Sequence, residues 1–182
     1  MIRYVAFLRA INVGGHRLIK MEELARIFTA AGLKNVRTYI QSGNVLFDTA
    51  SANAAGLQKK IEQALRHALG YEVPVMLMRL AEIEEIVRRN PFKRIKPASD
   101  VGLFVTFLSD EPRHDPELPL MSAIENLEVL EVKERAAFIV SRRKKNGMFG
   151  FPNKFVEKEL GVLGTTRNWS TVNKILKVAE KI

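Results

Sequence analysis

The sequence predicts an α+β fold of two tandem ferredoxin-like (split βαβ) subdomains with mainly antiparallel sheets. Three observations support this prediction. Residues 1–79 show strand and helix patterns in the order βαββαβ, residues 80–182 repeat most of that order, and short turns separate the paired strands. The chain has 182 residues, 47% of them hydrophobic, which is enough to bury a sizeable core. We therefore expect one subdomain at residues 1–79 and another, with a terminal helix, at residues 80–182.

The elements of the first subdomain follow from side-chain periodicity and from glycine stops. The strand segments are rich in β-branched and aromatic residues, whereas the helical segments repeat apolar residues at intervals of three and four. Gly32 and Gly70 follow the two helical segments, where glycine commonly ends a helix. In chain order we expect a strand at 2–8, a helix at 21–31, strands at 36–40 and 45–47, a helix at 54–69 and a strand at 72–78.

The second subdomain begins with a short helix that Pro91 ends. Residues 101–108 form a nearly continuous apolar run, as a strand buried on both faces would. The last strand of this subdomain is expected to be short or replaced. In chain order we expect a helix at 80–90, a strand at 101–108, a short helix near 120–125, strands at 127–132 and 137–141, a helix at 153–160 and a helix from about 171.

The chain is basic, with 29 Lys and Arg against 20 Asp and Glu and a net charge of +9. Residues 1–79 hold +6 of this charge, with eleven basic and five acidic side chains. Such an excess favours anionic partners, such as nucleic acid, phosphorylated metabolites or acidic proteins. Solubility alone explains the charge equally well.

Several classes of site are excluded or not expected. The chain has no cysteine, so disulfides, thiol nucleophiles and cysteine-ligated metals are excluded. His16, His67 and His114 fall on different elements without ligand spacing, so we expect no metal site and no cofactor. No secretory or transmembrane segment is predicted, which favours a cytoplasmic protein without a membrane partner. No residue is identified as catalytic, and enzymatic activity stays open.

The loop after the first strand combines glycines with basic and amide side chains before a predicted helix. Glycine N–H groups that converge on one point, together with a helix N-terminus, would bind an anion. The alternative is a tight turn that needs glycine for its backbone conformation. The candidate ligand-binding residues here are Arg9, Asn12, Gly14, Gly15 and Lys20.

The turn between the second and third strands is dense in hydrogen-bonding groups. Gln41, Ser42 and Asn44 are candidates to bind a polar ligand, although Gly and Asn are also what a hairpin turn requires. We expect the end of the first strand and this turn to lie toward opposite ends of their strands. The topology therefore does not guarantee one shared site with Arg9 and Asn12.

Residues 165–171 precede the last helix and contain a third candidate. Asn168 or Ser170 is a candidate N-cap, and Trp169 is predicted to anchor the helix. Arg167, with neighbouring threonine hydroxyls at a helix N-terminus, suits an oxyanion or phosphate group. We predict a structural role for Trp169 and a ligand-binding role for Arg167 with Asn168.

The strongest local run of charge consists of Arg142, Arg143, Lys144 and Lys145. Beside Phe149 and Phe151, this run would hold a nucleic-acid backbone with aromatic stacking, or it is the solvated end of a hairpin. Recognition of the type used by RNA-recognition modules is disfavoured, because Asn44 stands where an aromatic residue is needed on the third strand.

Four motifs occur in order along the chain: FLRAINVGG at 7–15, IKMEEL at 19–24, QSGNVLF at 41–47 and TTRNWSTV at 165–172. Together they resemble a widespread bacterial family of unknown function, over nearly the whole chain. The resemblance implies two ferredoxin-like subdomains and supplies no activity.

Three hypotheses for function follow. The first is an uncharacterised cytoplasmic protein that binds an anionic, phosphate-bearing small ligand. The second is sequence-independent binding of nucleic acid through a basic surface. The third is a structural or interaction protein whose motifs only hold the fold together.

Overall fold

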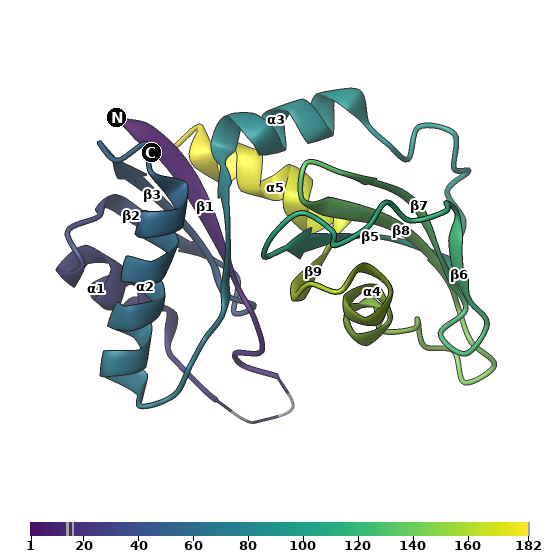
Figure 1. Cartoon of the computed structure of the whole chain (residues 1–182), viewed down its shortest axis with the longest axis horizontal. Coiled ribbons are helices and arrows are strands. Elements are labelled where there is room, and N and C mark those ends of the chain that lie inside the picture. The colour runs from purple at the N-terminus through teal and green to yellow at the C-terminus, as the bar shows by residue number, and fades with distance from the viewer. Residues whose placement is uncertain (14, 16, 182) are drawn as a thin grey trace. The chain divides into compact units, whose positions relative to one another are not determined.

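The computed structural model describes residues 1–13, 15 and 17–181 of the chain, which divides into two compact units (Figure 1). The first unit consists of Met1–Ile83 together with Ile175–Ile182, and the second consists of Glu84–Lys174. Each unit contains one antiparallel sheet with helices, which confirms the predicted α+β class.

The first unit is a ferredoxin-like βαββαβ arrangement. Its sheet has the strand order β2-β3-β1-β4, and every neighbouring pair is antiparallel. The two central strands, β3 and β1, are thereby joined to edge strands on either side. The elements of this unit are β1 (Ile2–Leu8), α1 (Met21–Ala30), β2 (Lys34–Tyr39), β3 (Asn44–Thr49), α2 (Ala54–Leu69) and β4 (Val75–Arg79).

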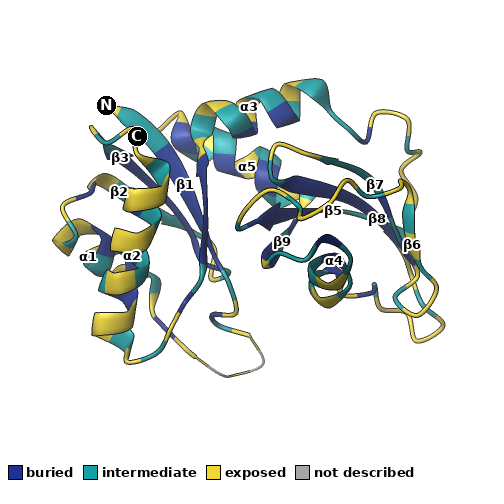
Figure 2. Ribbon diagram, in the orientation of Figure 1, coloured by how far each residue is buried: buried dark blue, intermediate teal, exposed yellow. Residues whose placement is uncertain are grey.

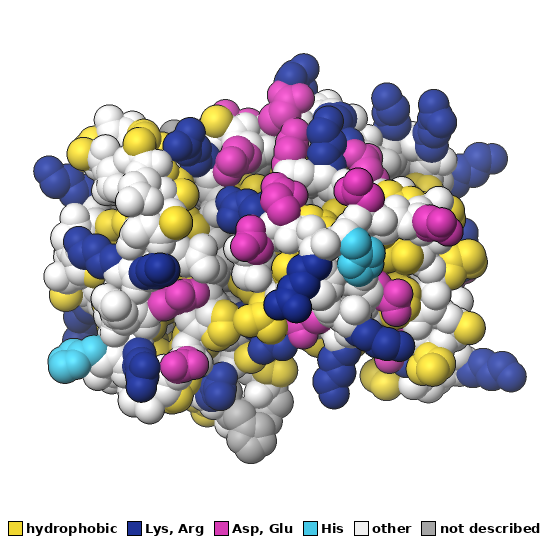
Figure 3. Space-filling view, in the orientation of Figure 1, with side chains coloured by type: hydrophobic (Ala, Val, Ile, Leu, Met, Phe, Trp, Pro, Cys, Tyr) yellow, Lys and Arg dark blue, Asp and Glu magenta, His cyan; other side chains and the backbone are white. Residues whose placement is uncertain are grey.

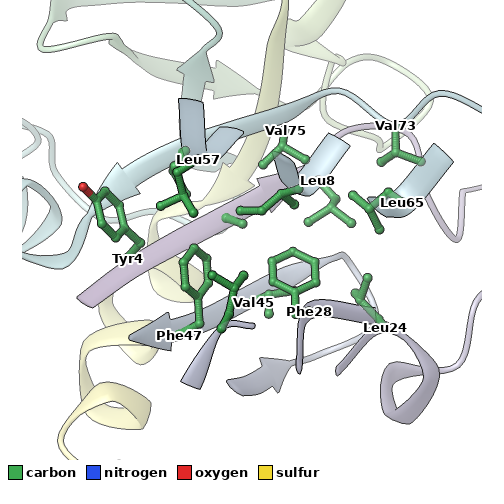
Figure 4. Close-up of a cluster of buried hydrophobic side chains, with 14 of the residues drawn as sticks. Tyr4, Leu8, Leu24, Phe28, Val45, Phe47, Leu57, Leu65, Val73 and Val75 are labelled. Atoms are coloured by element: carbon green, nitrogen blue, oxygen red, sulfur yellow. The ribbon is translucent and has the colours of Figure 1, made fainter. Parts of the chain in front are cut away.

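The core of the first unit lies between one face of this sheet and its two helices (Figure 4). Tyr4 and Leu8 alternate along β1 on this face, and Tyr4 stacks on Phe47 of β3 with ring centroids 5.9 Å apart. Phe28 of α1 packs against Phe47 at 5.7 Å. Each such side chain contributes about 1.5–3 kcal/mol on burial. Figure 2 shows the central strands buried and the outer faces of the helices exposed.

The second unit repeats the same strand order with one addition. Its sheet has the order β6-β7-β8-β5-β9, in which β7-β8-β5-β9 corresponds to β2-β3-β1-β4 and β6 is an extra edge strand. Helix α4 packs on one face of this sheet. The remaining elements of the chain are α3 (Leu80–Arg89), β5 (Val101–Leu108), β6 (Leu120–Ser122), β7 (Leu127–Lys133), β8 (Ala136–Arg142), α4 (Pro152–Leu160), β9 (Gly164–Asn168) and α5 (Trp169–Ala179).

The prediction of a short helix near residues 120–125 is wrong. Leu120 instead pairs with Val129, and Ser122 with Leu127, as the strand β6 beside β7. Leu120 also packs against the apolar cluster under α4. A segment of six residues cannot sustain a helix by itself, because helix nucleation is costly, so sheet pairing and burial decide its conformation.

The last strand of the second unit is the five-residue β9. Its sequence is polar, but its side chains bond within the unit: Thr166 Oγ1 lies 2.7 Å from Thr106 Oγ1 and donates to Asn153. Helix α5 begins directly after β9, at Trp169 rather than near residue 171. Ser170 therefore lies in the first helical turn and is not an N-cap.

Within the described part of the chain, no helix is long and apolar enough to cross a membrane.

Candidate functional site

The loop after β1 and the turn between β2 and β3 lie side by side. Phe7 near the end of β1 pairs with Asn44 at the start of β3, and the Leu8 N–H donates to the Gly43 carbonyl at 2.8 Å. The expectation that these segments lie toward opposite ends is wrong. The two strands are antiparallel, so the end of one lies beside the start of the other.

Asn12 fastens this loop to the turn. Its side-chain amide donates to the carbonyl of Ile19 at 3.1 Å and to that of Gln41 at 2.9 Å, and its Oδ1 accepts the Ile19 N–H at 2.8 Å. The two contacts with Ile19 close the loop on itself, and the contact with Gln41 joins the loop to the turn. This use of the amide is structural.

Gly43 and Asn44 make the turn compact. Gly43 has φ +74°, and a Cβ at this position would lie 2.6 Å from Ile11 Cδ1. Asn44 is completely buried, and its amide donates to the Tyr39 carbonyl at 2.9 Å and to Ser42 Oγ at 3.0 Å. Residues 7–13 and 41–47 therefore form one packed assembly, called the Asn12 assembly below.

The other candidates from the first loop, and Gln41 from the β2–β3 turn, lie nearer the surface. Arg9 is half-buried, and its backbone N–H donates to the Pro74 carbonyl at 2.9 Å. Gly15 and Gln41 are exposed, whereas Gly14 lies outside the described residues. Lys20 borders an open hollow on α1 of about 740 Å³. That hollow is lined by Leu18, Lys20, Glu23, Arg26, Ile27 and Ala30.

Arg167 lies inside the second unit. Only 7% of the residue is exposed, and its Nη1 donates to Thr165 Oγ1 and to the Thr166 carbonyl, both at 2.9 Å. Burial lowers the pKa of the Arg167 guanidinium to about 10, because the charged form loses hydration. Arg167 therefore remains charged at neutral pH and is bonded to the strand that carries it.

Asn168, the residue after Arg167, opens onto a pocket where β9 ends. The last pair between β5 and β9 is Phe104 with Asn168, so the first residues of β5 extend beyond the end of β9. The first turn of α5 closes the other side. This pocket, called the aromatic pocket below, has a volume of about 580 Å³ and is lined by Gly102, Leu103, Phe104, Phe149, Asn168, Trp169, Ser170 and Asn173.

The aromatic wall of this pocket is held in place by close packing. The rings of Phe104 and Phe149 meet edge to face at 5.9 Å. Gly102 makes room for them, because a Cβ there would lie 2.7 Å from Phe104 and 3.1 Å from Phe149. Trp169 packs edge to face on Phe92 at 5.2 Å, as its predicted anchoring role requires.

A fixed positive charge adjoins the Phe149 ring. The Arg143 guanidinium lies 4.6 Å from the ring centroid, in cation–π contact. Its Nε donates to the Ser99 carbonyl at 2.9 Å and its Nη1 to the Gly147 carbonyl at 2.6 Å. Arg143 is therefore held by three contacts while remaining exposed.

The rest of the predicted basic run differs in its contacts. Arg142 and Lys145 are exposed. Lys144 pairs with Glu125 at 3.2 Å. The Phe151 backbone N–H and then Lys144 hold the pKa of the Glu125 carboxyl below its usual value.

The aromatic pocket supplies flat apolar walls, two side-chain amides, a hydroxyl and the start of a helix. This set is suited to binding by stacking and hydrogen bonding. Within the described residues, no group of three or more His, Asp and Glu is placed to hold a metal ion. The sequence did not identify Gly102, Phe104 or Asn173, because the strand β9 that ends at this pocket was not predicted.

Comparison with models of known protein families assigns the chain to one family. A family model described as a protein of unknown function (DUF1697) matches residues 1–138, more than half of the sequence. The chain belongs to this family. The match confirms the resemblance to an uncharacterised bacterial family, and it covers the Asn12 assembly and the β5 side of the aromatic pocket. Phe149 and Trp169 lie beyond the matched residues of this DUF1697 chain.

A solved structure supports the fold. The chain resembles a conserved bacterial protein from Streptococcus pneumoniae with a TM-score of 0.66 and 23% sequence identity, over 96% of each chain. At this identity the likeness shows the shared fold. A comparison with curated proteins gave no match.

Proposed function

We propose that this DUF1697 chain is a binding protein for a phosphate-bearing small ligand with a planar ring, held in the aromatic pocket. The observation that carries the proposal is the convergence of Phe104, Phe149 and Trp169 with three polar residues of the β9–α5 junction, which are Asn168, Ser170 and Asn173. A volume of about 580 Å³ is within the usual range for small-molecule sites, which is roughly 300–1,000 Å³.

The planar ring is inferred from the wall of the pocket. Aromatic side chains present flat faces on which a ring stacks, and a stacked base contributes roughly 1–3 kcal/mol in other proteins. Asn168 and Asn173 each carry an amide, which both donates and accepts hydrogen bonds. The Asn173 Nδ2 already donates to the Trp169 carbonyl at 2.8 Å, which orients this side chain.

The phosphate is inferred from two sources of positive potential. The backbone N–H groups in the first turn of α5 carry the positive end of the helix dipole. Arg143 adds a full charge beside Phe149 and is already ordered by its contacts with Ser99 and Gly147. A guanidinium held in this way forms strong charge-assisted bonds to phosphate at a small entropic cost.

The proposal keeps one predicted ligand-binding residue, Asn168, in the pocket itself. Asn12 and Asn44 are engaged in backbone contacts, which favours the structural hypothesis for the first loop and the β2–β3 turn. Arg167 then acts from below the surface, as the residue that orients the end of β9 ahead of Asn168.

The test uses Trp169, which is the single tryptophan and lines the pocket. We expect a saturable change of its fluorescence with a nucleoside monophosphate, and weaker responses to the nucleoside or to inorganic phosphate alone. Phe149→Ala should weaken binding by roughly 5- to 150-fold, which corresponds to the loss of one stacking contact.

Phe151→Ala is the matched control. Phe151 is 61% exposed, lies two residues from Phe149 and does not line the pocket. Its replacement should leave the affinity unchanged. If wild-type protein gives no saturable response, or if both alanine variants bind as well as wild type does, the aromatic pocket is not the ligand site.

A further inference from the structure

We infer that the aromatic pocket takes a nucleotide that is part of a single-stranded nucleic acid, whose sugar–phosphate backbone continues over a neighbouring basic surface. The inference rests on the proposed function, since it places one base in the aromatic pocket. It adds a second contact region, called the basic rim below. The basic rim comprises Lys93, Arg94, Lys96, Arg142, Arg143, Lys144 and Lys145.

The basic rim adjoins the pocket through the sheet. Arg142, the last residue of β8, pairs with Val101, one residue before Gly102 of the pocket. The Arg143 N–H donates to the Asp100 carbonyl at 2.9 Å. Arg142 and Arg143 therefore both lie next to the start of β5.

The segment that carries this charge has an ordered turn. The Lys144 N–H donates to the Met148 carbonyl, and the Gly147 N–H donates to the Lys144 carbonyl, both at 2.8 Å. From the adjacent turn, the Asn126 amide donates to the carbonyls of Arg142 and Arg143 at 3.2 and 3.1 Å. A backbone fixed in this way presents its side chains at constant spacing, which lowers the entropic cost of binding a charged chain.

The loop from residue 91 to residue 100 adds the second part of the basic rim. Lys93, Arg94 and Lys96 are exposed, and the end of this loop touches Arg143 through Ser99 and Asp100. Figure 3 shows Lys and Arg side chains projecting at the right-hand end of the view, where Figure 1 places β6 and the surrounding loops.

The amount of charge favours a strand over a free nucleotide. The basic rim has seven cationic side chains, so a positive excess remains after Glu125, which pairs with Lys144, and Asp100 are counted against it. One phosphate group requires one or two of these cations. Several phosphates joined by a backbone would engage the others and release counterions, which makes the affinity depend on salt.

The experiment measures the fluorescence anisotropy of a labelled eight-nucleotide single strand at several salt concentrations. An oligomer of the same length with abasic sites carries the same phosphates without bases. We expect the normal oligomer to bind at least tenfold more tightly than the abasic oligomer, and Phe149→Ala to abolish this difference. Raising the salt concentration should weaken both complexes.

The basic rim is tested by replacing Arg142 and Lys145 together with alanine. This double variant should reduce the slope of log affinity against log salt by about 1.4, the value for two phosphate contacts on a single strand. The matched control replaces Lys59 and Lys60, two exposed residues of α2, and removes the same charge. The control should keep the wild-type slope.

The outcomes separate the two proposals. One outcome is that Phe149→Ala weakens binding of a mononucleotide, but the oligomer binds no more tightly than the mononucleotide does. The inference of a single-stranded nucleic acid then fails and the proposed function stands. If the two double variants behave alike, or if the abasic oligomer binds as well as the normal one, the protein attracts polyanions by net charge alone and the inference is overturned. If Phe149→Ala changes neither ligand's affinity, both proposals fail.

Discussion

Gly43 shows how a single residue joins two motifs. Its positive φ suits glycine, and its missing Cβ leaves the space that the buried Ile11 side chain fills. The QSGN turn therefore has its composition for two reasons, backbone conformation and close contact with the first loop. Neither reason involves a ligand.

We predict that Gly43→Ala destabilises the protein by roughly 2–4 kcal/mol, which combines the cost of a left-handed backbone for alanine with overpacking against Ile11. Gly70→Ala is the matched control, because Gly70 has φ +77° with open space around its Cβ position. It should lower the free energy of unfolding by only about 1 kcal/mol. Urea denaturation measures both, and equal losses would refute the role given to Ile11.

The sequence identifies polar residues at these positions but not the atoms that they contact. Asn12 and Asn44 were predicted as ligand-binding candidates because amides in glycine-rich turns suit both ligands and backbone. The amides of both residues bond to backbone carbonyls of neighbouring segments. Which carbonyls these amides reach depends on which strand ends meet, and the antiparallel pairing of β1 with β3 brings the first loop beside the β2–β3 turn. Ligand binding by Asn12 and Asn44 stays a prediction.

Individual elements could be predicted where one pattern dominates the segment. The bounds of β1, α2 and β5 agree with the prediction, because alternation, helical spacing or a continuous apolar run marks each of them. β6 and β9 were not predicted as strands, since each is short and stabilised by its neighbours. β9 bears polar side chains whose partners, such as Thr106, come from distant parts of the chain.

One ion-pair network connects several elements of the first unit. Arg3 of β1 bonds to Asp48 of β3 through Nε at 2.7 Å and Nη2 at 2.8 Å, and its Nη1 donates to the Ala179 carbonyl at the end of α5. Asn35 also donates to Asp48, at 2.8 Å. The hydrogen bonds from Arg3, followed by that from Asn35, hold the pKa of Asp48 below its usual value against the effect of burial.

This pKa shift gives a prediction with a defined sign. A carboxyl whose pKa is lower in the folded protein stabilises it above the unfolded-state pKa, about 3.9, and this stabilisation is lost as the pH falls through the folded-state pKa. We expect Asp48→Asn to reduce the free energy of unfolding by roughly 1–3 kcal/mol at pH 7. The deficit should begin to shrink below about pH 3.9, because the unfolded chain then binds a proton at Asp48 that the folded protein, with its lower pKa, does not yet bind.

Urea midpoints measured between pH 7 and pH 3 test this prediction. Glu72→Gln is a suitable control, because Glu72 forms an exposed pair with Arg66 at 3.4 Å. Exposed pairs add little stability, so this variant should follow the wild-type pH profile. A deficit for Asp48→Asn that stays constant down to pH 3 would show that the Asp48 charge is not responsible.

At the scale of the whole molecule, the sequence predicted the fold class better than the site. The βαββαβ order of the first half leads directly to its sheet, and the second unit uses the same strand order. The aromatic pocket is assembled from β5, the segment after β8, and the β9–α5 junction, so no local motif encodes it. The predicted subdomain limits, 1–79 and 80–182, stay a prediction that expression of the two fragments would test.

The most direct test of the central claim is a backbone amide NMR titration of the labelled protein with a nucleoside monophosphate. We predict that the shifted resonances belong to residues 102–104, 149 and 168–173, which line or adjoin the aromatic pocket. The amide chemical shifts of the first loop and of the β2–β3 turn should not change, because the polar groups of these two segments hold the fold together. Shifts concentrated at residues 9–20 and 41–44, with none around Trp169, would contradict the account.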